Sequence, residues 1–138
     1  MMKRAILLMA LLAAAGCGSS SSTAPTTSSA PYSQVDVAVG SGATAVAGRS
    51  ATVNYTLWLY DASKTEGKGA QIQNGSAFSF VVGNGSVIKG WDQGVPGMKV
   101  GGLRRLTIPP ELAYGNNPPG GIPVNATLVF DITLTAVQ

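Results

Sequence analysis

Apolar and polar residues alternate along three segments of the chain, and this alternation predicts β-strands. In residues 50–60 the apolar positions share one face, namely Val53, Tyr55, Leu57 and Leu59. Residues 77–83 and 126–137 alternate in the same way, with Phe78, Phe80 and Val82 together in the first and Leu128, Phe130, Ile132 and Leu134 together in the second. Each pattern is typical of a strand that is buried on one face.

Two further strands and one short helix complete the predicted elements. Residues 102–110, GLRRLTIPP, read as a fourth strand that ends at its two prolines, which cannot donate to a ladder. Residues 35–40 are predicted as a fifth strand on a weaker pattern. Only residues 86–98, SVIKGWDQGVPGM, favour a helix, of at most two turns, with Ser86 as the cap and Gly94 at its close.

A strand-rich chain with one short helix indicates an α+β fold, in which the sheet buries one face against the helix. Gly90 inside the helix is a poor helix former, so packing by Trp91 must hold the helix in place. We therefore expect Trp91 between helix and sheet. The Arg104 and Arg105 pair is interpreted as a solvated strand edge.

Composition agrees with one compact domain. The 138 residues are 45% apolar and 11% charged, and 18 glycines and 8 prolines predict many turns. The chain has no histidine, which removes most hydrolase mechanisms, and its sequence contains no metal-ligand cluster, so no cofactor is expected.

The first residues have the features of an export signal. Lys3 and Arg4 precede an apolar run at residues 5–15 that is too short to span a bilayer. Small residues before Cys17, the only cysteine, resemble the lipobox of bacterial lipoproteins, which predicts a signal peptide at residues 1–16 and lipidation of Cys17. The alternative is ordinary cleavage at an alanine, with Cys17 removed or left as a stray thiol.

Residues 17–33, rich in Ser, Thr, Ala and Pro, predict a flexible tether before a domain at residues 34–138. Gly18 after the cysteine favours the outer membrane, so we expect an exported protein at the periplasmic face of the envelope, held to the membrane by its lipid alone. Without Lys3 and Arg4, seven basic residues face six acidic ones, which argues against nucleic-acid binding. A monomer is expected.

Three segments resemble, in order and approximate spacing, the FKBP family of peptidyl-prolyl cis-trans isomerases. They are VNYTLWLYD at residues 53–61, FSFVVGNGSVIKGWDQGVPGMKVGGLRRLTIPPELAYG at 78–115 and GIPVNATLVFDITL at 121–134. The resemblance covers residues 35–138. It implies a twisted antiparallel sheet of about five strands wrapped on one short helix, and proline-containing polypeptides as substrates.

The resemblance also implies an apolar pocket for the proline ring, with the tryptophan at its floor. It assigns this pocket to Tyr55, Phe78, Val87, Ile88, Trp91, Tyr114, Ile122 and Phe130. The Ile88 amide and the Tyr114 hydroxyl are the implied donors to peptide carbonyls. The residue-level alternatives are that the aromatic side chains are ordinary core, as we expect for Phe80, and that the Tyr114 hydroxyl makes a structural hydrogen bond.

One short segment, IQNG at residues 72–75, departs from the family pattern. Ile72 stands where the family usually has phenylalanine, and Gln73 stands where it has an aspartate that approaches the rotating carbonyl. Glutamine offers hydrogen bonds without charge. We therefore expect reduced activity, and the departure leaves open whether the family's macrolide inhibitors bind.

Such a pocket needs no acid, base or metal, because rotation about an X-Pro bond only breaks amide resonance. Two other functions stay open. A tethered binding module or chaperone would capture proline segments with little turnover, and a structural envelope domain would lack an apolar cleft at Trp91.

Overall fold

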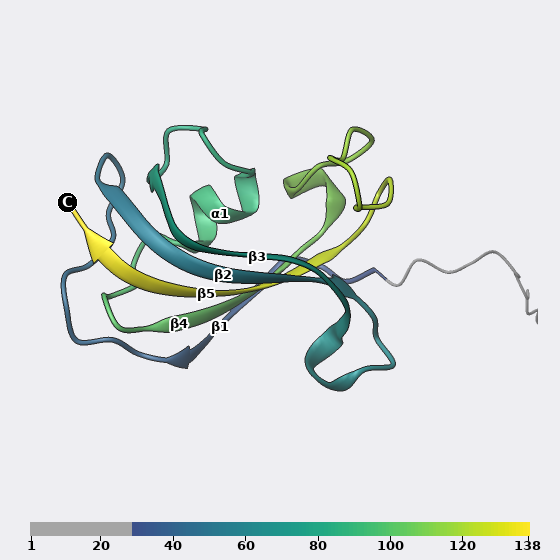
Figure 1. Cartoon of the computed structure of the whole chain (residues 1–138), viewed down its shortest axis with the longest axis horizontal. Coiled ribbons are helices and arrows are strands. Elements are labelled where there is room, and N and C mark those ends of the chain that lie inside the picture. Colours follow the sequence, from purple (N-terminus) through teal and green to yellow (C-terminus); the bar gives the residue numbers. More distant parts are fainter. Residues whose placement is uncertain (1–28) are drawn as a thin grey trace, which may run out of the picture.

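The computed structural model describes residues 29–138, and in them a short helix lies against one face of an antiparallel sheet (Figure 1). The strands are β1 (Ser33–Ala38), β2 (Ser50–Tyr60), β3 (Lys68–Val81), β4 (Leu103–Ile108) and β5 (Leu128–Val137). The helix is α1 (Lys89–Gly94), and the 3-10 turns are η1 (Thr65–Gly67) and η2 (Pro110–Leu112). The predicted α+β fold with five strands and one short helix is confirmed.

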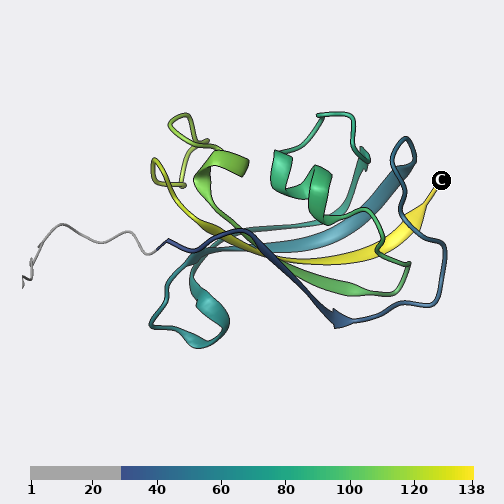
Figure 2. The ribbon, with the colours of Figure 1, turned by 180° about the vertical axis from the view of Figure 1, so that it is seen from behind.

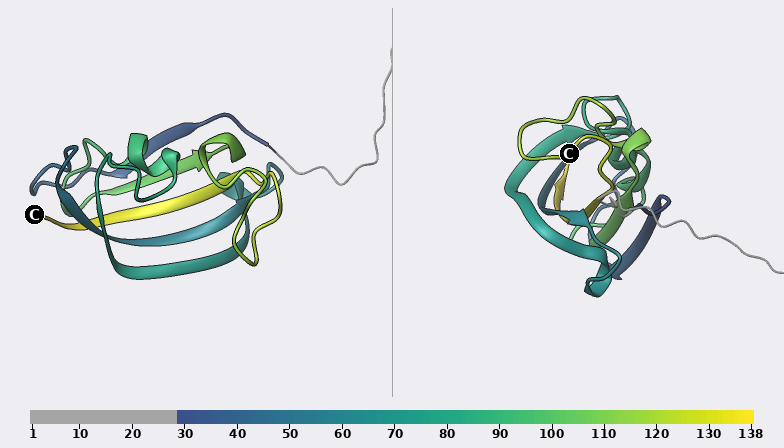
Figure 3. Two further views of the ribbon diagram at one scale, coloured as in Figure 1. Left: turned by 90° about the horizontal axis from the view of Figure 1, so that it is seen from above. Right: turned by 90° about the vertical axis from the view of Figure 1, so that its right-hand side faces the viewer.

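The strands lie in the order β1-β4-β5-β2-β3, with β5 at the centre and β1 and β3 at the edges. Phe130 of β5 pairs with Leu57 of β2 on one side and with Leu106 of β4 on the other. The sheet curls strongly, as the end-on view in Figure 3 shows, and α1 lies on its concave side. Figure 2 shows η2 and its following loop beside α1 on that same side.

Most of the alternating apolar positions predicted from the sequence belong to the core on the concave face. Val53, Leu57, Leu128, Ile132 and Leu134 are all buried there. On the convex face Asp131, Thr133 and Thr135 of β5 are more accessible, which is the expected result of a period of two in a sheet covered on one side. Helix and sheet therefore meet along a single apolar layer.

The predicted helix cap at Ser86 is wrong. The helix begins at Lys89, with Ile88 in extended conformation before it and no side-chain cap. Ser86 lies instead in a turn in which its amide donates to the Asn84 side chain at 3.1 Å. Because Ile88 has extended backbone dihedral angles, the helical conformation starts only at Lys89, three residues after Ser86.

Strand β3 is twice as long as its apolar pattern predicted. Its first half, with Gln71 and Gln73, has no apolar alternation, yet these residues pair with Trp58 and Leu57 of β2. Cross-strand pairing extends the strand where side-chain pattern gives no signal.

Near the start of the described region, Ser33 already pairs with Thr107, and Tyr32 packs against the core. The predicted signal peptide at residues 1–16, Cys17 and the tether up to residue 28 lie outside the described residues. Of the helices in residues 29–138, none has the length and apolar character that crossing a bilayer requires.

Candidate functional site

A pocket of about 80 Å³ opens on the concave face beside α1. Three strands and the helix contribute to it, and its lining residues are Tyr55, Leu57, Gln73, Phe78, Val87, Ile88, Trp91, Tyr114 and Phe130. Eight of these nine side chains are aliphatic or aromatic, and Gln73 is the exception. The pocket therefore presents an apolar surface with few polar groups at its rim.

Trp91 lies at the centre of an aromatic cluster. Its ring centroid lies 5.2 Å from that of Tyr55 and 5.3 Å from that of Phe130, both edge-to-face, and 5.9 Å from that of Phe78. Such T-shaped pairs stabilise beyond the area they bury. Trp91 is 4% exposed, whereas Phe78 is 41% exposed, so the indole forms the floor and Phe78 part of the rim.

Two glycines let the helix approach the sheet. A Cβ at Gly90 would lie 2.6 Å from two carbons of Ile108, and one at Gly94 would lie 2.8 Å from two carbons of Leu106. Any larger residue at either position would push the helix outward. The glycine that weakens the isolated helix therefore also sets the depth of Trp91.

The interpretation of Arg104 as a solvated edge is wrong. Arg104 is 7% exposed, and its Nη1 donates to the carbonyl oxygens of Gly94 at 2.7 Å and Pro96 at 3.1 Å. Its Nε donates to Asp36 of β1 at 2.6 Å. Because the last carbonyls of a helix have no partners within it, this guanidinium satisfies them and ties α1 to two strands.

The other end of the helix is held by Asp92. Its two carboxylate oxygens accept the amide hydrogens of Gly83 at 3.1 Å and Gly85 at 2.9 Å. These bonds fasten the loop between β3 and α1, in which both glycines have positive φ. Val87 and Ile88 are thereby placed at the pocket wall.

Few polar groups border the pocket. The side-chain amide of Gln73 donates to the Tyr55 hydroxyl at 2.7 Å. Within residues 29–138 no hydrogen bond engages the Tyr114 hydroxyl or the Ile88 amide, and the buried Trp91 Nε1 also has no partner. Burial, aided by the nearby Tyr55, raises the pKa of Tyr114, so its hydroxyl stays protonated at neutral pH.

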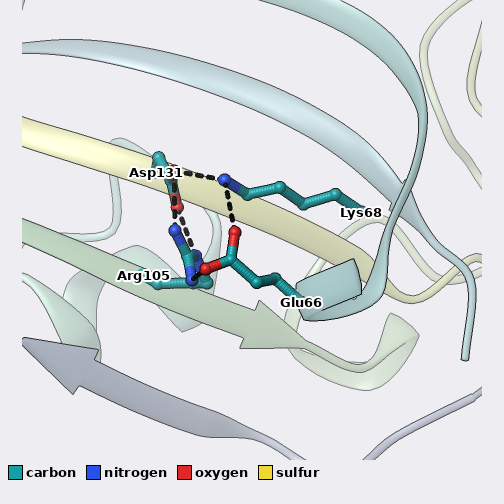
Figure 4. Close-up of polar contacts among 4 residues, drawn as sticks. All are labelled: Glu66, Lys68, Arg105 and Asp131. Carbon is teal, nitrogen blue, oxygen red and sulfur yellow. Dashed lines mark hydrogen bonds and ion pairs between the residues drawn. The ribbon is translucent and has the colours of Figure 1, made fainter. Parts of the chain in front are cut away.

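Charged residues gather away from the pocket, on the convex face (Figure 4). Asp131 accepts hydrogen bonds from Arg105 at 2.7 Å and from Lys68 at 2.8 Å, and Glu66 bridges the two cations. Arg105 is thus paired rather than solvated. Within the described part of the chain, no three His, Cys, Asp or Glu side chains are placed to hold a metal.

The structure brings together eight of the ten predicted pocket residues. Ile72 and Ile122 do not line the pocket: Ile72 is half-buried beside the loop at Gly121, and Ile122 is buried in the core. Leu57 lines the pocket and was not predicted to do so, although its place on the same strand face as Tyr55 was a usable signal. Phe80 is buried in the core, as expected.

Comparison with known proteins gives a consistent result. A family model described as FKBP-type peptidyl-prolyl cis-trans isomerase matches residues 41–135. FK506-binding protein of Neisseria meningitidis serogroup B is 44% identical over 103 residues, which are 74% of this chain and 92% of that protein. FK506-binding protein 4 of Mycosarcoma maydis is 44% identical over 115 residues, 82% of this chain, but the chain spans only 30% of that protein.

Two solved structures share the fold. The crystal structure of FkpA from Escherichia coli has a TM-score of 0.65 and 38% identity, over 78% of this chain and 48% of the other. That of AtFKBP13 also has a TM-score of 0.65, with 36% identity, over 78% of this chain and 93% of the other.

Proposed function

Because the chain belongs to the FKBP-type peptidyl-prolyl cis-trans isomerase family, we propose that it accelerates rotation about X-Pro bonds of exported polypeptides in the pocket above Trp91. One observation carries this proposal. An aromatic pocket with an indole floor lies beside two donors, the Ile88 amide and the Tyr114 hydroxyl, that no group in residues 29–138 engages. A proline ring fits the apolar floor, and peptide carbonyls fit the donors.

The chemistry follows from the nature of the barrier. An X-Pro bond rotates over a barrier of about 20 kcal/mol because twisting breaks amide resonance. In the twisted state the carbonyl carries less charge than in the planar state. An apolar pocket formed by Trp91, Phe78 and Phe130 therefore stabilises the twisted bond relative to the planar substrate, without moving a proton.

The required stabilisation is moderate. Each tenfold acceleration needs about 1.4 kcal/mol of preference for the transition state, so an acceleration of ~10⁵ needs about 7 kcal/mol. Desolvation by the aromatic walls, a twisted bound conformation and the Tyr114 and Ile88 donors share this amount. No covalent intermediate is needed.

Gln73 tunes the pocket in place of a carboxylate. Its amide bonds the Tyr55 hydroxyl and so orients that ring at the wall. A neutral amide interacts less with the reacting carbonyl than a carboxylate would, so we expect turnover below that of a chain with aspartate there. Several relatives are named FK506-binding proteins, and we propose that macrolides of that type occupy the same pocket with weakened affinity.

The cellular setting follows from the N-terminal sequence. The basic pair, the apolar run and Cys17 support export and lipid anchoring at the periplasmic face of the outer membrane. The enzyme would act there on slow prolyl steps in the folding of envelope and secreted proteins. Radiolabelled palmitate incorporated by the wild type and not by Cys17→Ser tests the anchor.

A binding module with little turnover is the second candidate, and Gln73 is the observation that favours it. This candidate predicts that proline peptides bind with no acceleration above the uncatalysed rate.

The test is a protease-free isomerisation assay on a short Ala-Pro peptide. We expect catalysis by the wild type, and a loss of at least tenfold in kcat/KM for Phe78→Ala, because Phe78 lines the rim and is exposed enough for truncation to spare the fold. Val35→Ala, at an exposed apolar position of β1 outside the pocket, is the control. Equal rates for Phe78→Ala and Val35→Ala would contradict the assignment.

A further inference from the structure

A second, larger hollow of about 600 Å³ lies at one end of the sheet. Its walls come from the end of β2 and the chain after it, from the start of β3, and from the chain that enters β5. Figure 1 shows these segments meeting at the same end of the sheet. Leu59, Ala70, Pro123 and Ala126 give it apolar walls, and Asp61 and Thr127 are among its polar residues.

The two hollows are neighbours along the strands. Leu57 of β2 lines the pocket above Trp91, and Leu59, two residues on and on the same face, lines the second hollow. On β3 the corresponding step is from Gln73 to Ala70. At about 3.3 Å per residue these steps are roughly 7 to 10 Å. An extended polypeptide covers that distance in two to three residues, and a less extended one in up to four.

Two polar side chains of the second hollow, those of Asp61 and Thr127, are the candidate groups for binding a ligand. The Asp61 Oδ1 accepts hydrogen bonds from the amide and the hydroxyl of Ser63 at 2.9 and 2.7 Å, and these bonds lower the pKa of the carboxyl. No ion pair among residues 29–138 uses Asp61, although Lys64 lies close enough to lower that pKa slightly further. The hollow therefore holds an ionised carboxylate at neutral pH.

Thr127 provides the second group. It is 2% exposed, and its buried hydroxyl has no hydrogen-bond partner within the described residues. A buried hydroxyl without a partner is unfavourable, so such a group in a native fold calls for an explanation. Thr127 is a wall residue of the hollow, and its hydroxyl lies just beneath the surface, so a small shift of the wall would let it accept a hydrogen bond from a bound donor.

We propose that this hollow binds a lysine or arginine side chain of the substrate, two to four residues along the chain from the proline. The basic head group has only donors, and Asp61 and the Thr127 hydroxyl are acceptors that match it. Leu59, Pro123 and Ala126 cover the aliphatic stem, as apolar surfaces do for long basic side chains. This inference rests on the proposed isomerase function and adds a preference for basic residues near the proline.

The test compares peptides that contain one Ala-Pro bond in a neutral sequence, with either lysine or glutamine placed two, three or four residues before or after the proline. We expect kcat/KM for lysine to exceed that for glutamine by roughly three- to tenfold in at least one position, and this ratio to fall as salt is added. A ratio near one at all six positions overturns the proposal.

Three variants identify the site. Asp61→Asn keeps an acceptor for Ser63 and removes the charge, and it should bring the lysine-to-glutamine ratio close to one. Thr127→Val removes the unpartnered hydroxyl at nearly constant shape and should lower the ratio by a smaller factor. Glu111→Gln removes the same charge from an exposed carboxylate outside the hollow and should leave the ratio intact. An unchanged ratio in Asp61→Asn would place the preference elsewhere.

Failure of the isomerase function is distinguishable from failure of this inference. The neutral peptide alone reports on catalysis. If the enzyme does not turn this peptide over, fluorescence anisotropy of labelled lysine and glutamine peptides still tests the second hollow. Tighter binding of the lysine peptides that is lost in Asp61→Asn supports a site for basic side chains. Equal binding of the two peptides rejects it.

Discussion

Tyr114 is the single residue whose chemistry is most open to test. Its hydroxyl is protonated at neutral pH and engages no group among residues 29–138. If it donates to a peptide carbonyl, Tyr114→Phe removes one hydrogen bond and keeps the ring. A bond of about 0.5–1.5 kcal/mol corresponds to a loss of roughly two- to tenfold in kcat/KM. Urea unfolding should show nearly unchanged stability, and unchanged kcat/KM would reassign this hydroxyl to a structural role.

Gln73 is the residue at which this chain departs most from its family. We expect Gln73→Asp to raise kcat/KM several-fold, because a carboxylate beside the Tyr55 hydroxyl restores a charge near the rotating carbonyl. Gln73→Asn, which has the same length as aspartate and no charge, is the matched control in the peptide assay. A rise in both variants would indicate that side-chain length is responsible, and no rise in either would remove Gln73 from the account.

Single residues also mark where sequence reasoning succeeds and fails. The sequence places Trp91 between helix and sheet because Gly90 weakens the helix, so that packing by Trp91 must hold the helix in place. Arg104 was misjudged because a charged residue is rarely buried, and only the folded chain shows that the carbonyls of Gly94 and Pro96 converge on it. Partners distant in sequence leave no local pattern.

At the scale of elements, helix α1 depends on Arg104 and Asp36. Replacing Arg104 by leucine leaves two helix-end carbonyls and one carboxylate without their donor. We expect the free energy of unfolding to fall by about 2–4 kcal/mol, seen as a lower midpoint in urea. Asp36→Asn should have a smaller effect, since Asp36 lies at the surface. Equal stability of Arg104→Leu and wild type would show that α1 is held by Trp91 alone.

The ionic cluster on the convex face links η1, β3, β4 and β5, and it should make stability depend on pH. Burial disfavours the charged form of Asp131, but hydrogen bonds and charge from Arg105 and Lys68 outweigh it and lower its pKa. A carboxyl with a lowered folded pKa stabilises the fold above its unfolded value of about 4, and this contribution is lost as pH falls through the folded pKa.

Asp131→Asn is therefore expected to unfold more readily than wild type at pH 7, by about 1–3 kcal/mol. The difference should begin to shrink below about pH 4, where the carboxyl of the unfolded wild type becomes protonated, and should vanish at lower pH, once the carboxyl of the folded wild type is protonated as well. Urea unfolding from pH 7 down to pH 2.5 measures this. A gap that stays constant across the range would mean that the Asp131 charge does not stabilise the fold.

At the scale of the whole molecule, alternation predicted the buried face of the sheet, and the resemblance placed eight pocket residues. The alternation of apolar residues could not give the full length of β3, because that length is set by pairing with β2. The sequence also could not show that Ile72 and Ile122 do not line the pocket, because the curl of the sheet decides which apolar side chains reach the pocket. The second hollow, formed by three distant segments, left no signal in the sequence.

In the proposed mechanism, an apolar pocket accelerates prolyl rotation without proton transfer. The most direct test of this mechanism is kcat/KM for an Ala-Pro peptide, measured without protease from roughly pH 6 to 9 in H₂O and in D₂O. We expect clear acceleration by the wild type, a flat pH profile and a solvent isotope effect near one, because the chain has no histidine and the pKa of Tyr114 is raised. Absence of acceleration, a bell-shaped profile or a large isotope effect would contradict it.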